Sequence, residues 1–536
     1  MCATQPSAPP TTAASPPRGR ARTRPAPRPW PGRVLPFRSR LHRTGVRSFH
    51  RVESGLTGVS GPGVPGDNEA GVIGWGTSWR MQGYLLMAER TGDPAYARRL
   101  AELVDGVLAA RDEVRGVADH RGVSGPVWST AGKFTAATAR IEDTDGNPAL
   151  EVTVCPPRAV QAEVTVEPQG EGRFSLAVTG QGRAPFSVEG LALDPHDERR
   201  ADRVVYAAHD QRTAVTARLV PAPDGAAGIR EVRPGTYPVE PARVALAAQT
   251  GMITYPMAGL VRLARERPAA VPREVHARLE GCLDAVLRAV RAHEYQWTAV
   301  SGGRGCYRWL REEPVSFAGA ELPTNEFLAV ARTLVHLAVL TGDEEHAERA
   351  AAMARALRGD LRRVGGARGA GETGDGGLAG DVAVWPYWPG FGRVYNGWSP
   401  TGSPEGDGSL YRPLYAPVTV PEDVTHALID LDFLHLYHRT PGLPPVFTRD
   451  DLRAVAATFT GHVVERHGRA WRMRHDVGGA GRPGTDRQQA HVAAWIPLRE
   501  HNPRLPVLVS AIHPSPPPAP YQGVDSYCGA LLARWS

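Results

Sequence analysis

Residues 325–357 read NEFLAVARTLVHLAVLTGDEEHAERAAAMARAL, and this stretch decides the fold that the sequence predicts. Apolar residues recur at helical spacing on both sides of Thr341-Gly342-Asp343. A glycine can end one helix in the left-handed conformation, and an aspartate can accept hydrogen bonds from the first backbone amides of the next helix. The stretch therefore predicts two helices joined by a short turn, which is a helical hairpin.

Similar hairpins are predicted in other parts of the chain. Thr91-Gly92-Asp93-Pro94 separates two amphipathic segments in the same manner. Looser copies occupy residues 250–293 and 421–465, and Thr448 is the expected N-cap in the second of these. Repeated helical hairpins are typical of a helical array, and long loops between them favour a closed toroid over a uniform solenoid. We therefore expect a mainly α fold, an α/α toroid of helical hairpins with an inserted antiparallel β module.

The inserted module is expected because the segments after the first hairpin alternate with a period of two residues. They are short, rich in Val and Thr, and cover residues 150–154, 162–168, 173–180, 185–193, 203–209 and 214–220. The expected organisation is a disordered Pro/Arg-rich tail at 1–66, the first hairpin of the toroid at 67–122, the β module at 123–245 and the remainder of the toroid at 246–536. Disorder of the tail is expected because it lacks apolar periodicity.

Length and charge exclude several classes of function. The chain has 536 residues and a formal net charge of +6, but residues 1–50 contain ten Arg and no acidic residue. The rest carries 52 basic against 56 acidic side chains, which argues against a nucleic-acid partner. No apolar run approaches the roughly 18 residues of a membrane span, and no apolar stretch follows the N-terminal arginines as a secretory signal requires. Localisation stays open, with the cytoplasm favoured, and the oligomeric state is unknown.

The sequence gives no indication of a cofactor. The five cysteines are scattered and include no CxxC pair, so neither a disulfide framework nor a structural zinc site is expected. No glycine-rich phosphate loop joins a strand to a helix, and no HExxH or GxSxG motif is present. We therefore expect no cofactor and no bound metal. Glu422, His426 and Asp430 could chelate an ion, but no preset ligand spacing supports such a site.

An aromatic loop, WPYWPGFGRVYNGW at residues 385–398, is too rich in Gly and Pro to be a helix. Sugar rings stack on aromatic side chains, so rings on an exposed loop are typical of carbohydrate binding. The candidate substrate-binding residues in this loop are Trp385, Tyr387, Trp388, Tyr395 and Trp398. Arg304, which stands between glycines, is a further candidate because a guanidinium can bind a carboxylate through two hydrogen bonds. The alternative is that the loop is a hydrophobic plug of the core.

The segment PEDVTHALIDLDFLHLYH, residues 421–438, is expected to form a helix with Pro421 at its first position. Glu422 and Asp423 would lie in the first turn, four and three residues before His426. A carboxylate that binds one ring nitrogen of an imidazole fixes its tautomer and raises the basicity of the other nitrogen. Glu422, Asp423 and His426 are therefore candidate catalytic residues. The alternative is that the two acids only stabilise the helix N-terminus.

Further catalytic candidates lie near the beginnings of other predicted helices. Asn325 and Glu326 begin the hairpin quoted above. In a toroid the beginnings of successive inner helices face one cavity, so both residues would share it with His426. Tyr255, near the beginning of the helix after the β module, could act as a phenolic acid or base. The alternatives are helix capping for Asn325 and Glu326 and core packing for Tyr255.

The order of these motifs resembles that of a known group of enzymes. The motifs are Gly74-Trp75-Gly76, Gly251-Met252-Ile253 with Pro256, Leu322-Pro323 with Asn325, the aromatic loop, and Glu422-Asp423 with His426. Over residues 67–122 and 246–465 the chain resembles the α/α-toroid carbohydrate-active enzymes. This group includes uronic-acid polysaccharide lyases, glucuronyl C5-epimerase-like proteins and six-hairpin glycosidases.

The resemblance implies a glycan substrate. Our main interpretation is lyase or epimerase chemistry on a uronic-acid-containing or related glycan, for which the residues would be Asn325, His426 and either Tyr255 or Tyr395. These residues would neutralise the uronate carboxylate and remove the proton from C5.

Two alternatives to this interpretation remain. In a glycoside hydrolase on the same fold, Asp423 or Glu422 would work with Glu326 as acid and base. A non-catalytic helical scaffold would instead bind a glycan or a protein through the aromatic loops.

Overall fold

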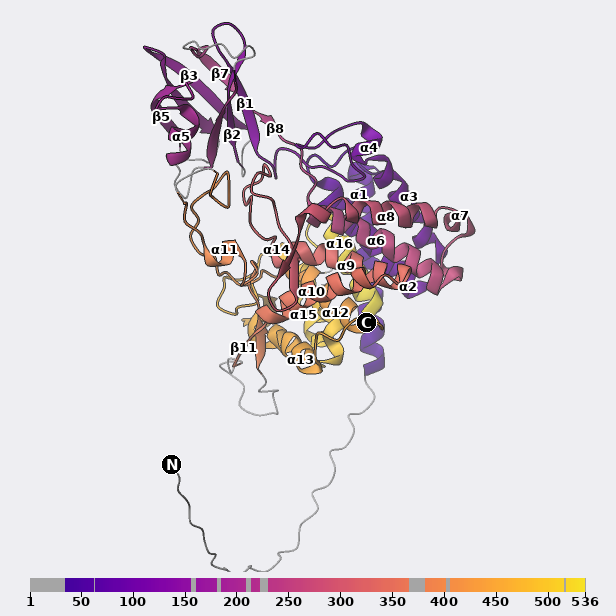
Figure 1. The fold of residues 1–536 in the computed structure, drawn as a ribbon. Coiled ribbons are helices and arrows are strands. Elements are labelled where there is room, and N and C mark those ends of the chain that lie inside the picture. Colours follow the sequence, from indigo (N-terminus) through magenta and orange to yellow (C-terminus); the bar gives the residue numbers. More distant parts are fainter. Residues whose placement is uncertain are drawn as a thin grey trace, which may run out of the picture.

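The chain folds into a mainly helical body from which a β-rich part projects (Figure 1). The computed structural model describes residues 34–61, 63–155, 161–180, 185–208, 214–221, 230–365, 381–401, 405–514 and 517–535. The predicted disorder of residues 1–33 therefore lies outside the described residues. Among the residues that are described, no helix is long and apolar enough to cross a membrane.

The hairpins around Gly92 and Gly342 form as the sequence predicts. They pair α2 (Ser78–Thr91) with α3 (Pro94–Ala109), and α9 (Thr324–Thr341) with α10 (Glu344–Asp360). Both glycines have a φ of 69°, the left-handed conformation that a glycine adopts without strain at a helix end. Asp93 and Asp343 each accept a hydrogen bond of 2.9 Å from the backbone amide two residues later. Local turn chemistry thus fixes both hairpins.

The looser copies also form. α6 (Ala247–Glu266) is joined to α8 (Leu279–Arg291) through η3 (Pro268–Ala270) and α7 (Arg273–His276), and α12 (Ala427–Arg439) is followed by α13 (Arg449–Thr458). Thr448 is the N-cap of α13, as predicted. Its hydroxyl accepts a hydrogen bond from the Asp451 amide, and the Asp451 carboxylate accepts one from the Thr448 amide.

Within the described residues, six helical segments contact one another in a closed circuit. They are α2, α6, α9, α12, the 3-10 segment η6 (Ala490–Glu500) and α16 (Gly523–Trp535), and α16 contacts α2 in turn. Further helices pack against this circuit: α3 on α2, α8 on α6, α10 on α9, α15 (Leu505–Ile512) on η6, and α1 (Val34–Ser60) on α16. Gln488, just before η6, donates a hydrogen bond of 3.4 Å to the hydroxyl of Thr425, just before α12. Arg487, beside it, donates one of 3.0 Å to the carboxylate of Asp525 in the first turn of α16. These helix beginnings therefore lie together at one end of the body.

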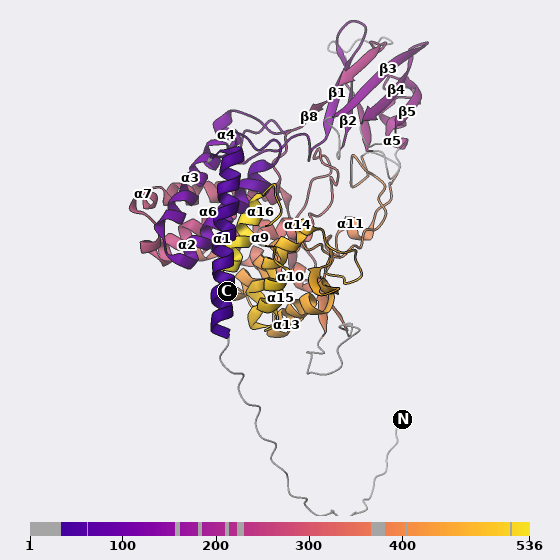
Figure 2. The ribbon, with the colours of Figure 1, turned by 180° about the vertical axis from the view of Figure 1, so that it is seen from behind.

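The helix α1 contradicts the predicted disorder over residues 34–60. It packs along α16 (Figure 2) and buries Leu41, Phe49 and Val52. Gly45 lies at the crossing, where a Cβ would approach the carbonyl oxygen of Gly529 to 2.7 Å. The prediction failed because these apolar residues are few and widely spaced in an arginine-rich segment. The surface that covers them comes from α16 at the other end of the sequence and, around Phe49, from Tyr84 and Tyr96.

The β-rich part contains, within its described residues, two four-stranded antiparallel sheets of order β6-β2-β1-β8 and β5-β4-β3-β7. The strands are β1 (Ala137–Glu142), β2 (Pro148–Val154), β3 (Ala162–Gly170), β4 (Arg173–Gly180), β5 (Phe186–Ala192), β6 (Val215–Leu219), β7 (Gly235–Pro238) and β8 (Glu240–Pro241). Their inward side chains form a core separate from that of the helical body. The predicted strand at 203–209 is wrong, because this segment belongs largely to the helix α5 (Ala201–Ala207). Ala201 and Val205 recur at helical spacing and are both buried.

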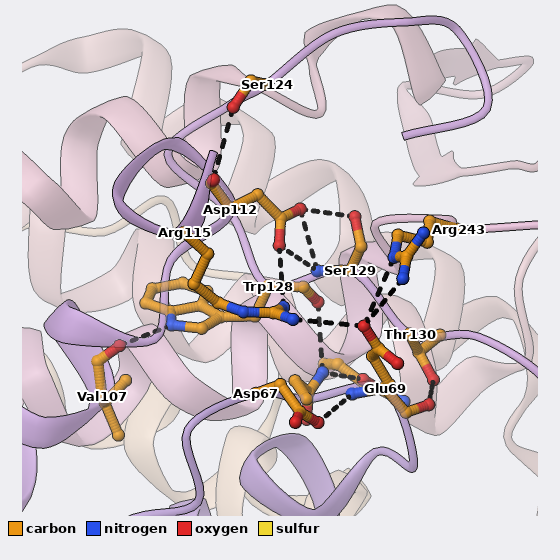
Figure 3. Close-up of polar contacts among 12 residues, drawn as sticks. Asp67, Glu69, Val107, Asp112, Arg115, Ser124, Trp128, Ser129, Thr130 and Arg243 are labelled. Carbon is orange, nitrogen blue, oxygen red and sulfur yellow. Dashed lines mark hydrogen bonds and ion pairs between the residues drawn. The ribbon is translucent and has the colours of Figure 1, made fainter. Parts of the chain in front are cut away.

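A polar cluster lies where the chain passes between the helical body and the β-rich part (Figure 3). The buried Asp112 accepts hydrogen bonds from the hydroxyl of Ser129 at 2.5 Å and from its amide at 3.1 Å. Glu69 binds Arg115 at 3.1 Å and Arg243 at 3.0 Å. Ser129 precedes the first strand and Arg243 follows the last, so the cluster ties both connections to the body.

Short elements complete the connections. They are η1 (Ile73–Thr77), α4 (Asp112–Arg115), η4 (Glu294–Gln296), β9 (Trp297–Val300), β10 (Arg304–Tyr307), β11 (Arg362–Val364), β12 (Val382–Val384), α11 (Arg393–Asn396), η5 (Phe459–Val463), β13 (Val464–His467), β14 (Ala470–Met473) and α14 (Asp486–Gln489). α14 leads directly into η6.

The close crossing of α1 and α16 predicts a sharp difference between two glycines of α1. Gly45→Ala should lower the free energy of unfolding by about 1–3 kcal/mol, because the added methyl group overpacks against Gly529. Gly58→Ala is the matched control, since a Cβ there meets nothing within 4 Å. It should leave stability unchanged or raise it by up to about 1 kcal/mol. Urea denaturation of both variants measures this, and equal stability of the two would contradict the packing of α1 on α16.

Candidate functional site

The backbone of the site is an extended segment at residues 420–424. The Tyr387 amide donates to the Val420 carbonyl at 3.0 Å, and the Glu422 amide donates to the Trp385 carbonyl at 2.9 Å. On the other side, the Val477 amide donates to the Glu422 carbonyl at 2.9 Å. The Val424 amide donates to the His475 carbonyl at the same distance. The predicted helix start at Pro421 is therefore wrong, because α12 begins only at Ala427. The pairing with two neighbouring segments holds Pro421 and Glu422 in an extended conformation.

Asp423 and His426 form an ion pair at the beginning of α12. The Asp423 Oδ1 accepts hydrogen bonds from the amides of Thr425 at 2.7 Å and His426 at 3.2 Å, which caps the turn. Its Oδ2 lies 2.5 Å from the His426 Nδ1. The Asp423 side chain is 22% exposed and that of His426 is 41% exposed, so this pair is open to a ligand.

The ion pair shifts the pKa of both partners. Burial alone would raise the pKa of Asp423, but its interaction with His426 outweighs burial and lowers the pKa to about 2. Burial alone would lower the pKa of His426, but Asp423, Glu326 and Asp430 raise it above its usual value. Each partner therefore favours the charged form of the other.

Glu422 and Asp430 are buried behind this pair. Their exposed fractions are 0% and 1%, and the Trp385 Nε1 donates to the Asp430 Oδ2 at 2.8 Å. Burial and the negative charge of Asp430 raise the pKa of Glu422 well above its usual value. Burial also raises the pKa of Asp430, to about 7. These carboxyl groups consequently hold protons to much higher pH than exposed acids do.

The beginning of α9 brings Glu326 to the same place. The Thr324 amide donates to the Tyr387 carbonyl at 3.0 Å, and the Tyr387 ring lies 5.1 Å from the His426 ring. Burial raises the pKa of Glu326 to about 7, and the charge of His426 partly opposes this shift. Asn325, beside it, is 1% exposed, and its Oδ1 has no hydrogen-bond partner among the described residues. Glu326 and His426 lie close enough for the charge of each to shift the pKa of the other.

Tyr255 lies elsewhere. Its ring, in the middle of α6, stacks on the ring of His336 in α9 with 5.2 Å between the ring centres. The guanidinium carbon of Arg332, also in α9, lies 4.3 Å from the centre of the Tyr255 ring. Tyr255 is only 7% exposed. This agrees with core packing, the alternative given for it, and contradicts its assignment as a catalytic base beside His426.

The aromatic loop is divided between core and surface. Trp385 and Trp388 are 1% and 5% exposed, so they plug the core and cannot stack on a sugar. Trp398 is partly exposed and stacks on Tyr415 at 4.7 Å. Trp398 also lines a shallow hollow of about 500 Å³ with Phe391 and other residues of this loop.

Tyr395 and Arg304 are partly exposed. Arg304 donates to the Ser301 carbonyl at 2.9 Å and lies 4.9 Å from the centre of the Phe391 ring. Arg304 is therefore placed against Phe391 and not in the acid cluster around His426.

His491, in η6, is a residue of the site that the sequence analysis missed. It is 3% exposed, and neither ring nitrogen has a hydrogen-bond partner within the part of the chain that the structure describes. Burial lowers its pKa to about 4, and the charges of Asp423 and His426 both act on it. The capping box of Thr485 with Gln488, which begins α14, was the sequence signal for a further helix start here.

Comparisons with known proteins give weak similarities only. No protein-family model and no curated protein matches the chain. Two solved structures of inactive variants of the alpha-1,6-mannanase GH76A of Salegentibacter sp. HEL1_6, in complex with alpha-1,6-mannotetrose and alpha-1,6-mannotriose, are similar to it. They share 11% and 12% identity, cover 54% of this chain and 74% and 75% of their own, and have TM-scores of 0.32 and 0.31. Similarities of this size carry no argument about fold or activity.

The buried carboxyl groups give the stability of the protein a component that falls as the pH rises from about 4 to about 7, whereas buried histidines such as His491 and His513, whose pKa values are lowered to about 4, give a component that rises. Glu326 and Asp430 have folded pKa values of about 7, against about 4 in an unfolded chain. Between these values the folded state binds more protons, so its stability falls by up to about 1.4 kcal/mol per pH unit for each such group. The raised pKa of His426 acts in the same direction above about 6.5.

Denaturation of the wild type and of Asp430→Asn at pH values from 4.5 to 8 isolates the component that Asp430 contributes. The variant keeps an acceptor for Trp385 and the buried histidines but lacks this titrating group, so the free energy of unfolding of the wild type minus that of the variant should fall as the pH rises from 4.5 to about 7. A difference that stays constant or rises over this range would show that the fold does not hold a proton on Asp430.

Proposed function

We propose that the chain is a glycan-acting enzyme with the fold of a closed α/α toroid, and that it hydrolyses a neutral glycan. The observation that carries this proposal is the placement of Glu326 beside the Asp423–His426 ion pair. Glu326 comes from α9 and the pair from α12, and the contact of Tyr387 with both elements brings them together. The closed circuit of helical segments supports the toroid. Convergence of these groups favours an enzyme over a non-catalytic scaffold.

The pKa values suit an acid and a base. Glu326, with a pKa of about 7, keeps its proton near neutral pH and can donate it to a leaving-group oxygen. Asp423, with a pKa of about 2, stays ionised and holds the His426 ring. Glycoside hydrolysis requires two carboxyl groups whose pKa values are pushed apart in this way. We assign Glu326 as the general acid, and Asp423 with His426 as the group that positions water or stabilises positive charge.

The charge of the site favours a neutral sugar over a uronate. Glu326, Glu422, Asp423 and Asp430 are all close enough to His426 or to one another to affect pKa values there. A uronate carboxylate would need a cation in this cluster, and His426 is already paired with Asp423 at 2.5 Å. The candidate cation Arg304 instead binds Ser301 and lies against Phe391. We therefore rank hydrolysis of a neutral glycan above lyase or epimerase chemistry.

Substitutions of Glu326 and His426 test this function. On a panel of neutral α- and β-linked polysaccharides, with release of reducing sugar as the assay, Glu326→Gln and His426→Ala should each lower kcat/KM by at least about a hundredfold. The wild-type rate should fall as the pH rises through about 7, where Glu326 loses its proton.

Two controls separate catalysis from folding. Glu326→Gln should recover activity on an aryl glycoside whose leaving group needs no protonation, whereas His426→Ala should not. His438→Ala, an exposed histidine on the same helix, should behave as the wild type. Folded Glu326 and His426 variants with normal turnover would refute the assignment of this site.

Proton abstraction from a uronate is the second candidate, and the contact of Tyr387 with His426 favours it. A phenol beside an imidazole can remove and return a proton at C5, and Tyr387 occupies the position that sequence analysis gave to Tyr255 or Tyr395. A lyase would produce unsaturated ends that absorb in the ultraviolet, and an epimerase would exchange the C5 hydrogen with solvent. We expect neither signal on uronate polymers. Either signal, if abolished by Tyr387→Phe, would replace hydrolysis as the function.

A further inference from the structure

Three side chains at the site offer ligand atoms for a metal ion. One donor atom each from Glu422, Asp423 and His426 lies within 4.8 Å of the others. The His426 Nδ1 is 3.8 Å from the Glu422 Oε1 and 2.5 Å from the Asp423 Oδ2. Tetrahedral ligands at about 2.0–2.2 Å from a common zinc ion lie about 3.3–3.6 Å apart. The distance from the His426 Nδ1 to the Glu422 Oε1 is close to this range, whereas the Asp423–His426 pair would have to open by about 1 Å. The ion would take the place of the protons on Glu422 and on the His426 Nδ1.

The second observation is a set of buried polar atoms that have no protein partner. The Glu422 Oε2 and the Asp430 Oδ1 belong to buried side chains and, apart from each other, have no hydrogen-bond partner within the described residues. Both ring nitrogens of the buried His491 also lack a partner there. Buried polar atoms are rarely left without partners in folded proteins. A cation at the Asp423–His426 pair would give the Glu422 carboxylate and the buried His426 Nδ1 a partner.

We propose that Glu422, Asp423 and His426 bind one divalent cation of the borderline class, Zn²⁺ or Mn²⁺. Imidazole nitrogen together with carboxylate oxygen suits these ions, whereas Ca²⁺ prefers a shell of six to eight oxygen atoms. Three protein ligands leave a position for water, as in catalytic zinc sites. Access is provided by His426 and Asp423, which are 41% and 22% exposed.

The cation site goes beyond the acid–base roles proposed above. A cation held there would lower the pKa of a bound water and so supply a nucleophile close to Glu326. Binding of the ion requires neither substrate nor Glu326. Failure of the cation site and failure of the proposed hydrolysis can therefore be told apart.

Calorimetric titration of the full chain tests this proposal. After dialysis against a chelator, ZnCl₂ and MnCl₂ should each be tried, with CaCl₂ as the comparison. The expected result is one equivalent of Zn²⁺ or Mn²⁺ bound with a Kd of about 1 μM or below, a rise in Tm on binding, and much weaker binding of Ca²⁺. Elemental analysis of the dialysed complex should confirm the one-to-one ratio.

Variants locate the ion. His426→Ala and Asp423→Asn should each weaken binding by at least about tenfold to a hundredfold. Glu326→Gln and His438→Ala should bind as the wild type does, since the first removes only the proposed acid and the second an exposed histidine of α12. If His426→Ala fails to fold, Asp423→Asn carries the test. No binding, a preference for Ca²⁺, or unchanged binding by the folded variants would overturn the proposal.

Discussion

The packing of α16 between α1 and α2 is the contact on which the arrangement of the site depends. α16 comes from the C-terminal end of the chain, whereas α1 and α2 come from the N-terminal end, so their contact closes the circuit of helical segments. The contact requires glycines, because a Cβ at Gly45, Gly83 or Gly529 would press against the facing backbone or side chains. Once the circuit is closed, the beginnings of α12, η6 and α16 are held at one end of the body. Residues far apart in the sequence, such as Glu326 and His491, can then lie close to His426.

Closing the circuit in this way gathers acids where helices begin. Asp430 lies in the first turn of α12, where the partial positive charge of the helix N-terminus favours an ionised acid, yet burial raises its pKa to about 7. Asp423 stands in the turn before the helix, where its Oδ1 accepts two backbone amides. Burying Glu422 and Asp430 side by side costs stability, and natural proteins accept such local cost chiefly at functional sites. This cost supports the site proposed above.

Much of the helical fold could be predicted because its signals are local. A left-handed glycine followed by a capping aspartate defines the turn at Gly342-Asp343 within a few residues, and the capping box of Thr448 does the same. α1 could not be predicted in this way, since its few apolar residues have meaning only against α16. Trp385 shows the same limit: its position in an aromatic loop indicated sugar binding, but its Nε1 is committed to the buried Asp430. Tyr387, two residues later, is the ring that reaches His426.

The sequence set two explanations of Asp423 against each other, helix capping and a role in the site, and the structure places Asp423 in a turn that ends before α12 begins at Ala427. A carboxylate has two oxygen atoms, and each has a different task. The Oδ1 accepts the amides of Thr425 and His426, while the Oδ2 contacts the His426 ring. These bonds within the turn fix the direction of the other oxygen, and the ion pair gains an orientation that a freely rotating surface aspartate would not have. The turn is thus the means by which the backbone positions the charged pair, and spacing alone indicated the contact of Asp423 with His426 because the whole arrangement lies within four residues.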